Sequence, residues 1–266
     1  MLNELSPTNV VLLNKKGIEC FYDGYIDRAA EYYEQALKRL FTDSSDMTQE
    51  ILYSRKRKAP EQVKIADLSH LTTFRVESFD YDEASEDDDD HDMEYDSWQE
   101  MSAIIVIYNL SLVYFVKKQW REAERLLSLL LQAGGIPISN FCDIHDLSTA
   151  IEETILAHDD RIFPLVVVSS YHLLGQISCF ADGLKATKLE QLCRGMNMFL
   201  LAIAVGQSCL SPLHFLVGSA FSTLGHALIY AHCYEEAMGA FARSWDIARY
   251  RAIIQETKTP AAAAAA

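Results

Sequence analysis

The sequence predicts an all-α fold, and three observations support this prediction. Helix-breaking residues are sparse, because only 11 glycines and 6 prolines occur among 266 residues. Apolar residues recur at spacings of three and four along most of the chain, which is typical of a helix with one buried face. Half of the residues are hydrophobic, which is enough for the core of one large domain or two small ones.

The first expected element is a helical hairpin over residues 1–41, which turns at the stretch FYDGY. The composition then changes, because a basic stretch, YSRKRKAPEQ, precedes an acidic one, FDYDEASEDDDDHDMEYD. Runs of like charge repel one another and bury too little apolar surface to become ordered. We therefore expect a disordered basic and acidic insertion over residues 42–96. The pattern leaves open whether a short helix forms near residues 60–70.

Helical patterning resumes at Ser97, which is placed to form a capping box with Glu100. The main interruption is QAGGIPISNFCDIHD, after which a short helix is expected from about Leu147 to Ala157. The six alanines at the end of the sequence are of low complexity and carry no information on the fold. In order, the remaining elements are a second hairpin over 97–133, a loop with the short helix over 134–161, a third and extended hairpin over 162–206, a fourth hairpin over 211–251, and a C-terminal tail over 252–266.

The negative charge of the chain is concentrated in one segment. Eleven acidic residues and no basic residue lie between Asp80 and Asp96, so the rest of the chain carries only −4 of the total −15. Phosphate binding requires clustered lysine and arginine. The charge therefore argues against nucleic acid as the main partner.

A pattern of small and large residues repeats in three of the hairpins. Each copy is centred on an alanine, namely Ala29, Ala123 or Ala237. Another small residue stands twelve positions before the alanine, and a large residue stands four positions after it. Small residues on two packed helices let their axes approach, and the large residues fill the space beside them. The remaining hairpin fits if its turn region is eight residues longer. The residues expected to make these contacts are Leu13, Gly17, Ala29, Tyr33, Ile107, Ser111, Ala123, Leu127, Tyr171, Gly175, Gly195, Phe199, Phe221, Gly225, Ala237 and Phe241.

This pattern of small and large residues resembles the tetratricopeptide repeat, whose period is about 34 residues. The resemblance covers about 140 of the 266 residues. The proline that usually closes a repeat is missing throughout, Lys16 replaces an expected leucine, and the repeats are not evenly spaced. The resemblance implies an interrupted α-solenoid, which is a right-handed superhelical stack of antiparallel helix hairpins.

The resemblance also implies a function, because proteins of this family usually act as scaffolds. The first helices of their hairpins line a concave groove that accepts a peptide or a helix of a partner. Here the groove would be uncharged and rich in aromatic residues, which suits an apolar peptide, an amphipathic helix or a second copy of the chain. By the register of the repeats, the lining residues are Asn14, Ile18, Phe21, Tyr22, Tyr108, Leu112, Phe115, His172, Gln176, Phe180, Ser222, His226, Ile229 and Tyr230.

Chaperone-binding members of the family hold a terminal carboxylate of the partner with lysine, arginine and asparagine side chains. Asn109 matches one of these positions, but Ile18, Leu173 and Ser169 occupy others. We therefore predict no carboxylate clamp.

The sequence contains no Gly-rich phosphate loop, no GxSxG, no HExxH and no CxxC. We therefore expect no enzyme activity, no metal, no cofactor and no small-molecule substrate. The six cysteines are interpreted as buried reduced thiols of a cytosolic or nuclear protein.

An alternative function assigns the activity to the acidic insertion, as in a nuclear regulatory protein or a chaperone of histones and other basic proteins. The RKRK stretch from Arg55 to Lys58 is either a nuclear import signal or a solvated basic patch. Ser85 lies directly before five consecutive acidic residues, in a context that acidophilic kinases prefer.

Localisation is expected to be cytoplasmic or nuclear, since no signal peptide is visible at the start of the sequence. The uncharged run over residues 195–234 is long enough for a membrane span. Gln207, Pro212 and His214 fall in its middle, which favours two buried helices joined by a polar turn over membrane insertion.

Overall fold

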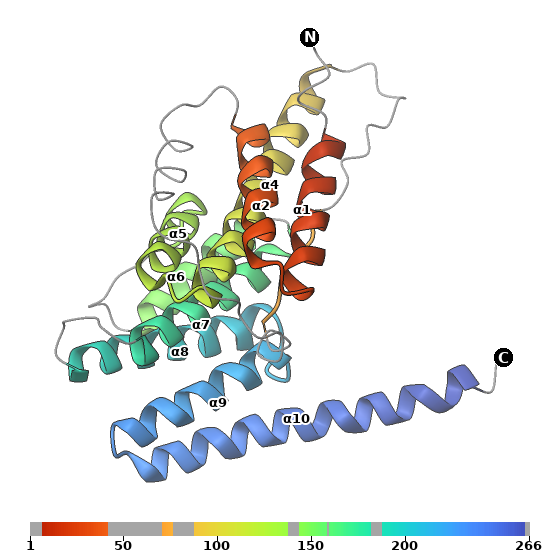
Figure 1. The fold of residues 1–266 in the computed structure, drawn as a ribbon. Helices are drawn as coiled ribbons and strands as arrows, with labels where there is room; N and C mark the ends of the chain where they lie inside the picture. Colours follow the sequence, from red (N-terminus) through yellow and green to blue (C-terminus); the bar gives the residue numbers. More distant parts are fainter. Residues whose placement is uncertain are drawn as a thin grey trace. The chain divides into compact units, whose positions relative to one another are not determined.

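The computed structural model describes residues 7–41, 71–76, 88–137, 144–158, 160–181 and 188–263. Within these ranges every regular element is a helix and no strand occurs, which confirms the all-helical prediction (Figure 1). The helices are α1 (Pro7–Tyr22), α2 (Ile26–Leu40), α4 (Asp88–Val116), α5 (Trp120–Ala133), α6 (Ile144–Ala157), α7 (Phe163–Phe180), α8 (Lys188–Cys209), α9 (Phe215–Tyr230) and α10 (Tyr234–Ala263).

The chain divides into two compact units, Met1–Gly134 and Gly135–Ala266. In the first unit α1 packs against α2, α2 against α4, and α4 against α5. In the second unit α7 packs against α8, α8 against α6 and α9, and α9 against α10. Most of the contacts between helices therefore join elements that follow one another along the chain.

Three of the helix pairs come close at a glycine that faces an aromatic ring. A Cβ atom added to any of these glycines would lie less than 3 Å from the ring, a separation that real Cβ atoms essentially never show. The repeated sequence pattern of small and large residues had placed these same glycines and aromatic residues at equivalent positions. From the added Cβ atom to the nearest ring atom, the distance is 2.5 Å for Gly17 and Tyr33, 2.5 Å for Gly175 and Phe199, and 2.8 Å for Gly225 and Phe241.

The three alanines at the centre of the repeated sequence pattern are buried. Ala29 and Ala123 are fully buried, and Ala237 is 2% exposed. Small side chains at these positions let α2, α5 and α10 pack closely against their neighbours. Of the other residues expected at the helix contacts, Leu13, Phe221 and Phe241 are half-buried and the rest are buried.

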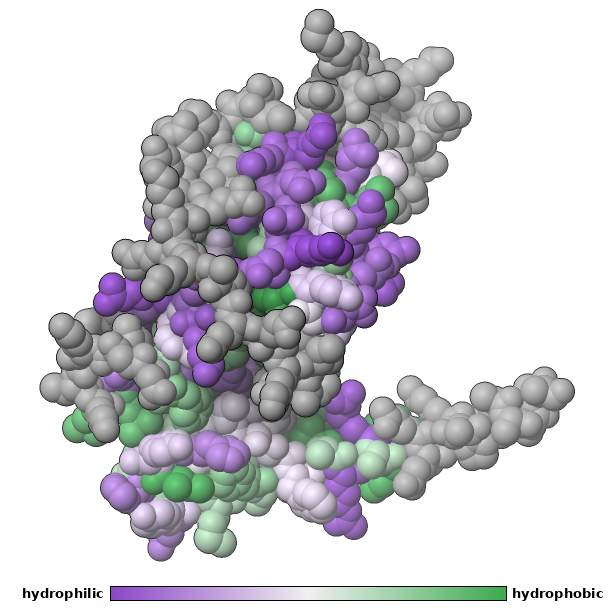
Figure 2. Space-filling model, viewed as in Figure 1, coloured by the Kyte–Doolittle hydropathy of each residue, from purple (hydrophilic) through white to green (hydrophobic). Residues whose placement is uncertain are grey.

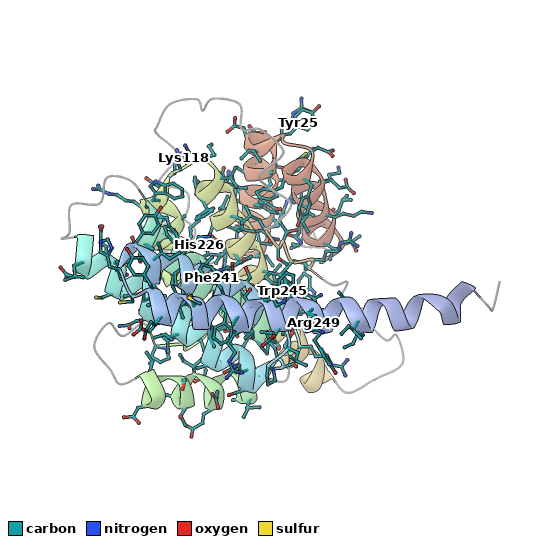
Figure 3. The ribbon with its side chains drawn as sticks, turned by 90° about the horizontal axis from the view of Figure 1, so that it is seen from below. Tyr25, Lys118, His226, Phe241, Trp245 and Arg249 are labelled. Atoms are coloured by element: carbon teal, nitrogen blue, oxygen red, sulfur yellow. The ribbon has the colours of Figure 1, made fainter. Side chains whose placement is uncertain are left out.

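Each of these alanines follows a turn of the same form. The residue five positions before the alanine has a positive φ, with values of 81° at Gly24, 57° at Lys118 and 60° at His232. In each turn this residue donates its backbone N–H to the carbonyl three positions earlier, and the next residue donates to the carbonyl five positions earlier. These are the hydrogen bonds of a Schellman motif, which ends a helix by satisfying its last carbonyls. Tyr25 and Lys118, at two of these turns, are labelled in Figure 3.

The expectation of disorder over residues 42–96 is wrong for two parts of that range. Residues 71–76 are non-helical, and three of their side chains, Leu71, Phe74 and Val76, are buried. Residues 88–96 belong to the first turns of α4. The charge pattern was interpreted only as self-repelling, although negative charge is favourable at the start of a helix. The RKRK stretch, Ser85 and residues 60–70 lie outside the described residues.

Two boundaries also differ from the sequence prediction. Ser97 lies inside α4, nine residues after its first residue, so it does not cap a helix with Glu100. Helix α10 continues to Ala263, through most of the residues that were expected to form a tail. Both differences lengthen a helix, because the apolar pattern marks only the part of a helix that is packed against a neighbour.

The expected cytoplasmic or nuclear localisation is also corrected. Within the described residues, three helical segments are long and apolar enough to cross a membrane, and this points to a membrane protein rather than a soluble one. The sequence argument tested only the run over 195–234, whose middle is a polar turn. The three segments are Ser97–Val116, Phe163–Phe180 and Leu189–Cys209, the last of which ends before that turn.

Candidate functional site

The fourteen residues expected to line a groove lie on α1, α4, α7 and α9. Their exposure to solvent differs between the two units. In the first unit Asn14, Ile18, Phe21, Tyr108 and Leu112 are buried. The expectation that these side chains face an open groove therefore does not hold. Tyr22 is exposed and Phe115 is half-buried.

Part of the reason for this burial is that the 71–76 segment lies on the side chains of α1 and α4. At its centre Asn14 and Asn109 are almost fully buried, and Nδ2 of Asn109 donates to Oδ1 of Asn14 at 3.0 Å. The carbonyl of Phe74 accepts from Nδ2 of Asn109 at 2.7 Å and from Nδ2 of Asn14 at 3.1 Å. The N–H of Phe74 donates to Oδ1 of Asn109 at 3.0 Å. A single amide side chain thus binds both backbone groups of one residue.

Side chains hold the segment on either side of this contact. The ring of Phe74 lies 5.1 Å from the ring of Tyr108. The hydroxyl of Tyr22 donates to the carbonyl of Leu71 at 3.0 Å, and the backbone N–H of Thr73 donates weakly to that hydroxyl at 3.4 Å. Arg75 is exposed. The segment is therefore bound through its backbone and its apolar side chains, with its charged side chain directed to solvent.

The sequence analysis missed this segment. The run LTTFRV places apolar residues at positions 71, 74 and 76 and includes β-branched residues, which favour non-helical structure. This signal is only six residues long. Asn14 and Asn109 had each been noted for other reasons, but their partner, Phe74, is 35 residues from Asn109 and 60 from Asn14.

In the second unit the corresponding side chains are more open. We call this set, formed by His172, Gln176 and Phe180 of α7 with Ser222, His226, Ile229 and Tyr230 of α9, the α7–α9 surface. Phe180, His226, Ile229 and Tyr230 are exposed, and the other three are half-buried.

Direct contacts join the two helices of the α7–α9 surface. The Nε2 atom of His172 lies 2.9 Å from Oγ1 of Thr223, and the ring centroids of Phe180 and Tyr230 are 5.9 Å apart. His226 stacks edge-on against Phe241 of α10 at 5.0 Å, and the two are labelled side by side in Figure 3. Thr223 was not among the expected residues, because its role depends on a contact between helices that periodicity does not show.

Among the described residues, no group of three or more His, Cys, Asp or Glu side chains is placed to hold a metal ion. Five cysteines, at positions 20, 179, 193, 209 and 233, are free thiols, and Cys142 lies outside the described residues.

His214 is a titratable group that caps a helix. It is the N-cap of α9, where its Nδ1 atom accepts the backbone N–H of Leu216 at 3.3 Å. Burial, with a smaller contribution from the positive charge of Arg251, lowers the pKa of His214 below its usual value. The lowered pKa favours the neutral side chain, which is the form that accepts this hydrogen bond.

Comparison of the chain with protein-family models, with curated proteins and with solved structures finds no match, so the assignment of a function depends on these contacts alone.

Proposed function

We propose that this chain is a non-catalytic, membrane-associated scaffold whose α7–α9 surface binds an amphipathic helix or an apolar peptide of a protein partner. One observation carries the proposal, namely that Phe180, Ile229 and Tyr230 are 39%, 43% and 68% exposed on two packed helices. Large apolar side chains that gather on a surface mark interaction sites more often than single exposed ones do.

The chemistry of the two helices indicates the kind of partner. Neither α7 nor α9 contains an aspartate, glutamate, lysine or arginine. A strongly acidic or basic peptide would find no opposite charge on this surface, so apolar contacts would supply most of the affinity. His226 and Gln176 provide polar groups at its edge. On the face of the molecule seen in Figure 2, green apolar residues also gather over α8 and α9.

The helix pairs support the finer architecture that we propose, which is a stack of antiparallel hairpins of the tetratricopeptide type. Three pairs place a glycine against an aromatic ring, and three turns share one hydrogen-bonding pattern. Scaffolds of this type present the first helix of each pair to the partner. Helices α7 and α9 are the first helices of two such pairs.

The test compares three forms of the full chain, each with an affinity tag and extracted from membranes in a mild detergent. The double variant Ile229→Asp with Tyr230→Asp places charge on the α7–α9 surface. Tyr250→Asp is the matched control, because Tyr250 is a similarly exposed tyrosine on α10. We expect the double variant to lose at least about tenfold of a co-purifying protein that the wild type and the control retain, as removal of central contact residues does at other interfaces.

Two results would contradict the proposal. Equal recovery of the same proteins by all three forms would show that the α7–α9 surface binds no partner. Recovery of lipid alone, with loss of lipid in the double variant, would show that this surface faces the bilayer. Light scattering of the purified chain identifies the case in which the partner is a second copy.

A further inference from the structure

We propose that the surface of α1 and α4 is a binding site for extended peptides, and that the 71–76 segment is its internal ligand. A partner peptide with the same pattern, Leu-x-x-Phe-x-Val, would bind there by replacing the segment. This inference rests on the proposed scaffold function only in assuming that such a partner exists. It concerns a different surface from the one on α7 and α9.

The hydrogen bonds define what the site recognises. Asn109 binds the N–H and the C=O of Phe74 together, and Asn14 provides a second donor to the same carbonyl. In an extended chain these two backbone groups of one residue point to the same edge, so one amide side chain can pair with both. These hydrogen bonds therefore recognise the extended backbone at one position and do not themselves depend on the side chain there.

Side-chain contacts add sequence preference to this backbone recognition. Phe74 packs beside Tyr108, and the buried side chains of Leu71 and Val76 flank it. Positions 72, 73 and 75 are half-buried or exposed. A ligand thus needs an aromatic residue at the centre and apolar residues three positions before and two positions after it, whereas the position directly after the aromatic residue, where Arg75 is exposed, accepts a charged side chain.

An empty site would leave the side chains of Asn14 and Asn109 without some of their hydrogen-bond partners. Both side chains lie in the interior and are almost fully buried. Without the segment, their amide groups would lose the partners that they have on Phe74, and loss of a hydrogen-bond partner destabilises a polar group in the interior. A partner backbone that restores these hydrogen bonds offsets the loss of the segment, which favours exchange of one ligand for another over an empty site.

Tethering strengthens the internal ligand. The segment is joined covalently to α2 and to α4, so its binding to the site is intramolecular and its effective concentration there exceeds that of a free peptide in dilute solution. A partner peptide of the same intrinsic affinity will compete poorly with the intact chain. Weakening the segment should open the site.

The experiment measures binding of a fluorescent peptide with the sequence of residues 69–78 to the full chain in detergent, by fluorescence anisotropy. We compare the wild type with Phe74→Ala, which removes the central side chain of the internal ligand and leaves the site itself unchanged. Two further peptides serve as controls, one with alanine in place of the phenylalanine and one N-methylated at the amide of that phenylalanine. The N-methyl group removes the donor that pairs with Oδ1 of Asn109.

We expect Phe74→Ala to bind the parent peptide at least about tenfold more tightly than the wild type does, and to bind both control peptides at least about tenfold more weakly than the parent. Circular dichroism establishes that the variant keeps its helix content. If it does not, the milder Val76→Thr replaces it, with a smaller increase expected in the same direction.

Two outcomes would overturn the inference. Equal affinity of the folded variant and the wild type for the parent peptide would show that the segment does not compete for the site. Equal affinity for the parent and the N-methylated peptide would show that the backbone of Phe74 is not what is recognised. Neither outcome depends on Ile229 or Tyr230, so failure here is distinct from failure of the proposed scaffold function.

Discussion

The two units build their helix pairs in the same way but leave the first helices in opposite states. In the first unit, α1 and α4 carry a buried asparagine pair and are covered by the 71–76 segment. In the second unit, α7 and α9 carry exposed Phe180 and Tyr230. The difference shows that one packing scheme supports two kinds of surface. A polar centre binds backbone and must be filled, whereas an apolar surface can stay open.

The largest effect is expected where this polar centre is removed. Asn109→Leu leaves the N–H of Phe74 and Oδ1 of Asn14 without their partner, and two unpaired buried groups cost about 4 kcal/mol. Thermal or denaturant unfolding measures this loss, and hydrogen exchange should show lost protection of the Phe74 amide. Gln176→Leu on α7 is the matched control, since Gln176 is only half-buried. Similar losses in both variants would remove the contrast between the two surfaces.

A second prediction concerns the apolar helices, two of which belong to the second unit. The segment Leu189–Cys209 is 44% buried, against 72% for each of the other two, so it offers the most side chains to a bilayer. Leu200 is exposed near its middle, and an arginine at the centre of a spanning helix costs about 3 kcal/mol. We expect Leu200→Arg to reduce the fraction of chain that resists alkaline extraction from membranes.

Leu189→Arg is the control for this second prediction. Leu189 is also exposed but lies at the end of the same segment, where a long charged side chain reaches the interface at little cost. Equal extraction of the two variants and the wild type would show that this segment does not meet lipid.

The third prediction compares glycines at the helix contacts. A Cβ atom on Gly175 would meet both the Phe199 ring and, at 3.0 Å, the carbonyl oxygen of Gly195, which belongs to the backbone and cannot turn away. Gly175→Ala should therefore destabilise the second unit by about 3 kcal/mol, the upper range for overpacking. For Gly17→Ala in the first unit the three atoms nearest to the added Cβ all belong to the Tyr33 ring, a side chain that can shift, so the cost should be smaller.

Gly239 provides the control for these glycines, because a Cβ atom there meets nothing within 4 Å. Gly239→Ala should stabilise α10 by about 0.5–1 kcal/mol, the usual gain of alanine over glycine within a helix. Denaturant unfolding of the three single variants measures the order. A loss in Gly239→Ala as large as that in Gly175→Ala would mean that contact between helices is not the cause.

The smallest effect is expected from pH, through the cap of α9 in the second unit. The folded-state pKa of His214 is lowered, so protons bind the unfolded chain more readily. Its contribution to stability is therefore complete above the unfolded pKa of about 6.5 and is lost as the pH falls through the lower folded pKa. His214→Asn keeps a capping side chain that does not titrate. The difference in melting temperature between wild type and variant should change between pH 7 and pH 5, and a constant difference would contradict the prediction.

The sequence allowed prediction of what repeats locally. The spacing of small and large residues aligned Gly17 with Tyr33 and Gly225 with Phe241, because both partners lie within one pair of helices and are set by helical periodicity. It also aligned Gly175 with Phe199 across the longer connection.

What the sequence did not predict depends on distant or opposing effects. The position of residues 71–76 is fixed by asparagines on two other segments, and no local pattern encodes such a contact. The start of α4 in the acidic run is the outcome of charge repulsion against the helix dipole, two effects of opposite sign. The membrane-compatible segment Leu189–Cys209 was missed because the tested run straddled the turn at residues 210–214, and the other two segments lie outside that run. The expected exposure of Phe21 and Leu112 was wrong because both are fully buried in the core of the first unit.

The shared turn at Gly24, Lys118 and His232 limits how the length of this chain can vary. Each residue added to or removed from such a turn would rotate the second helix by about 100° around its axis and move the following alanine off the contact. Single-residue insertions and deletions should therefore be rejected in these three turns. In the α7–α8 pair the matched glycine and aromatic ring are eight positions further apart, which is close to two whole helical turns and so keeps the same helix faces in contact.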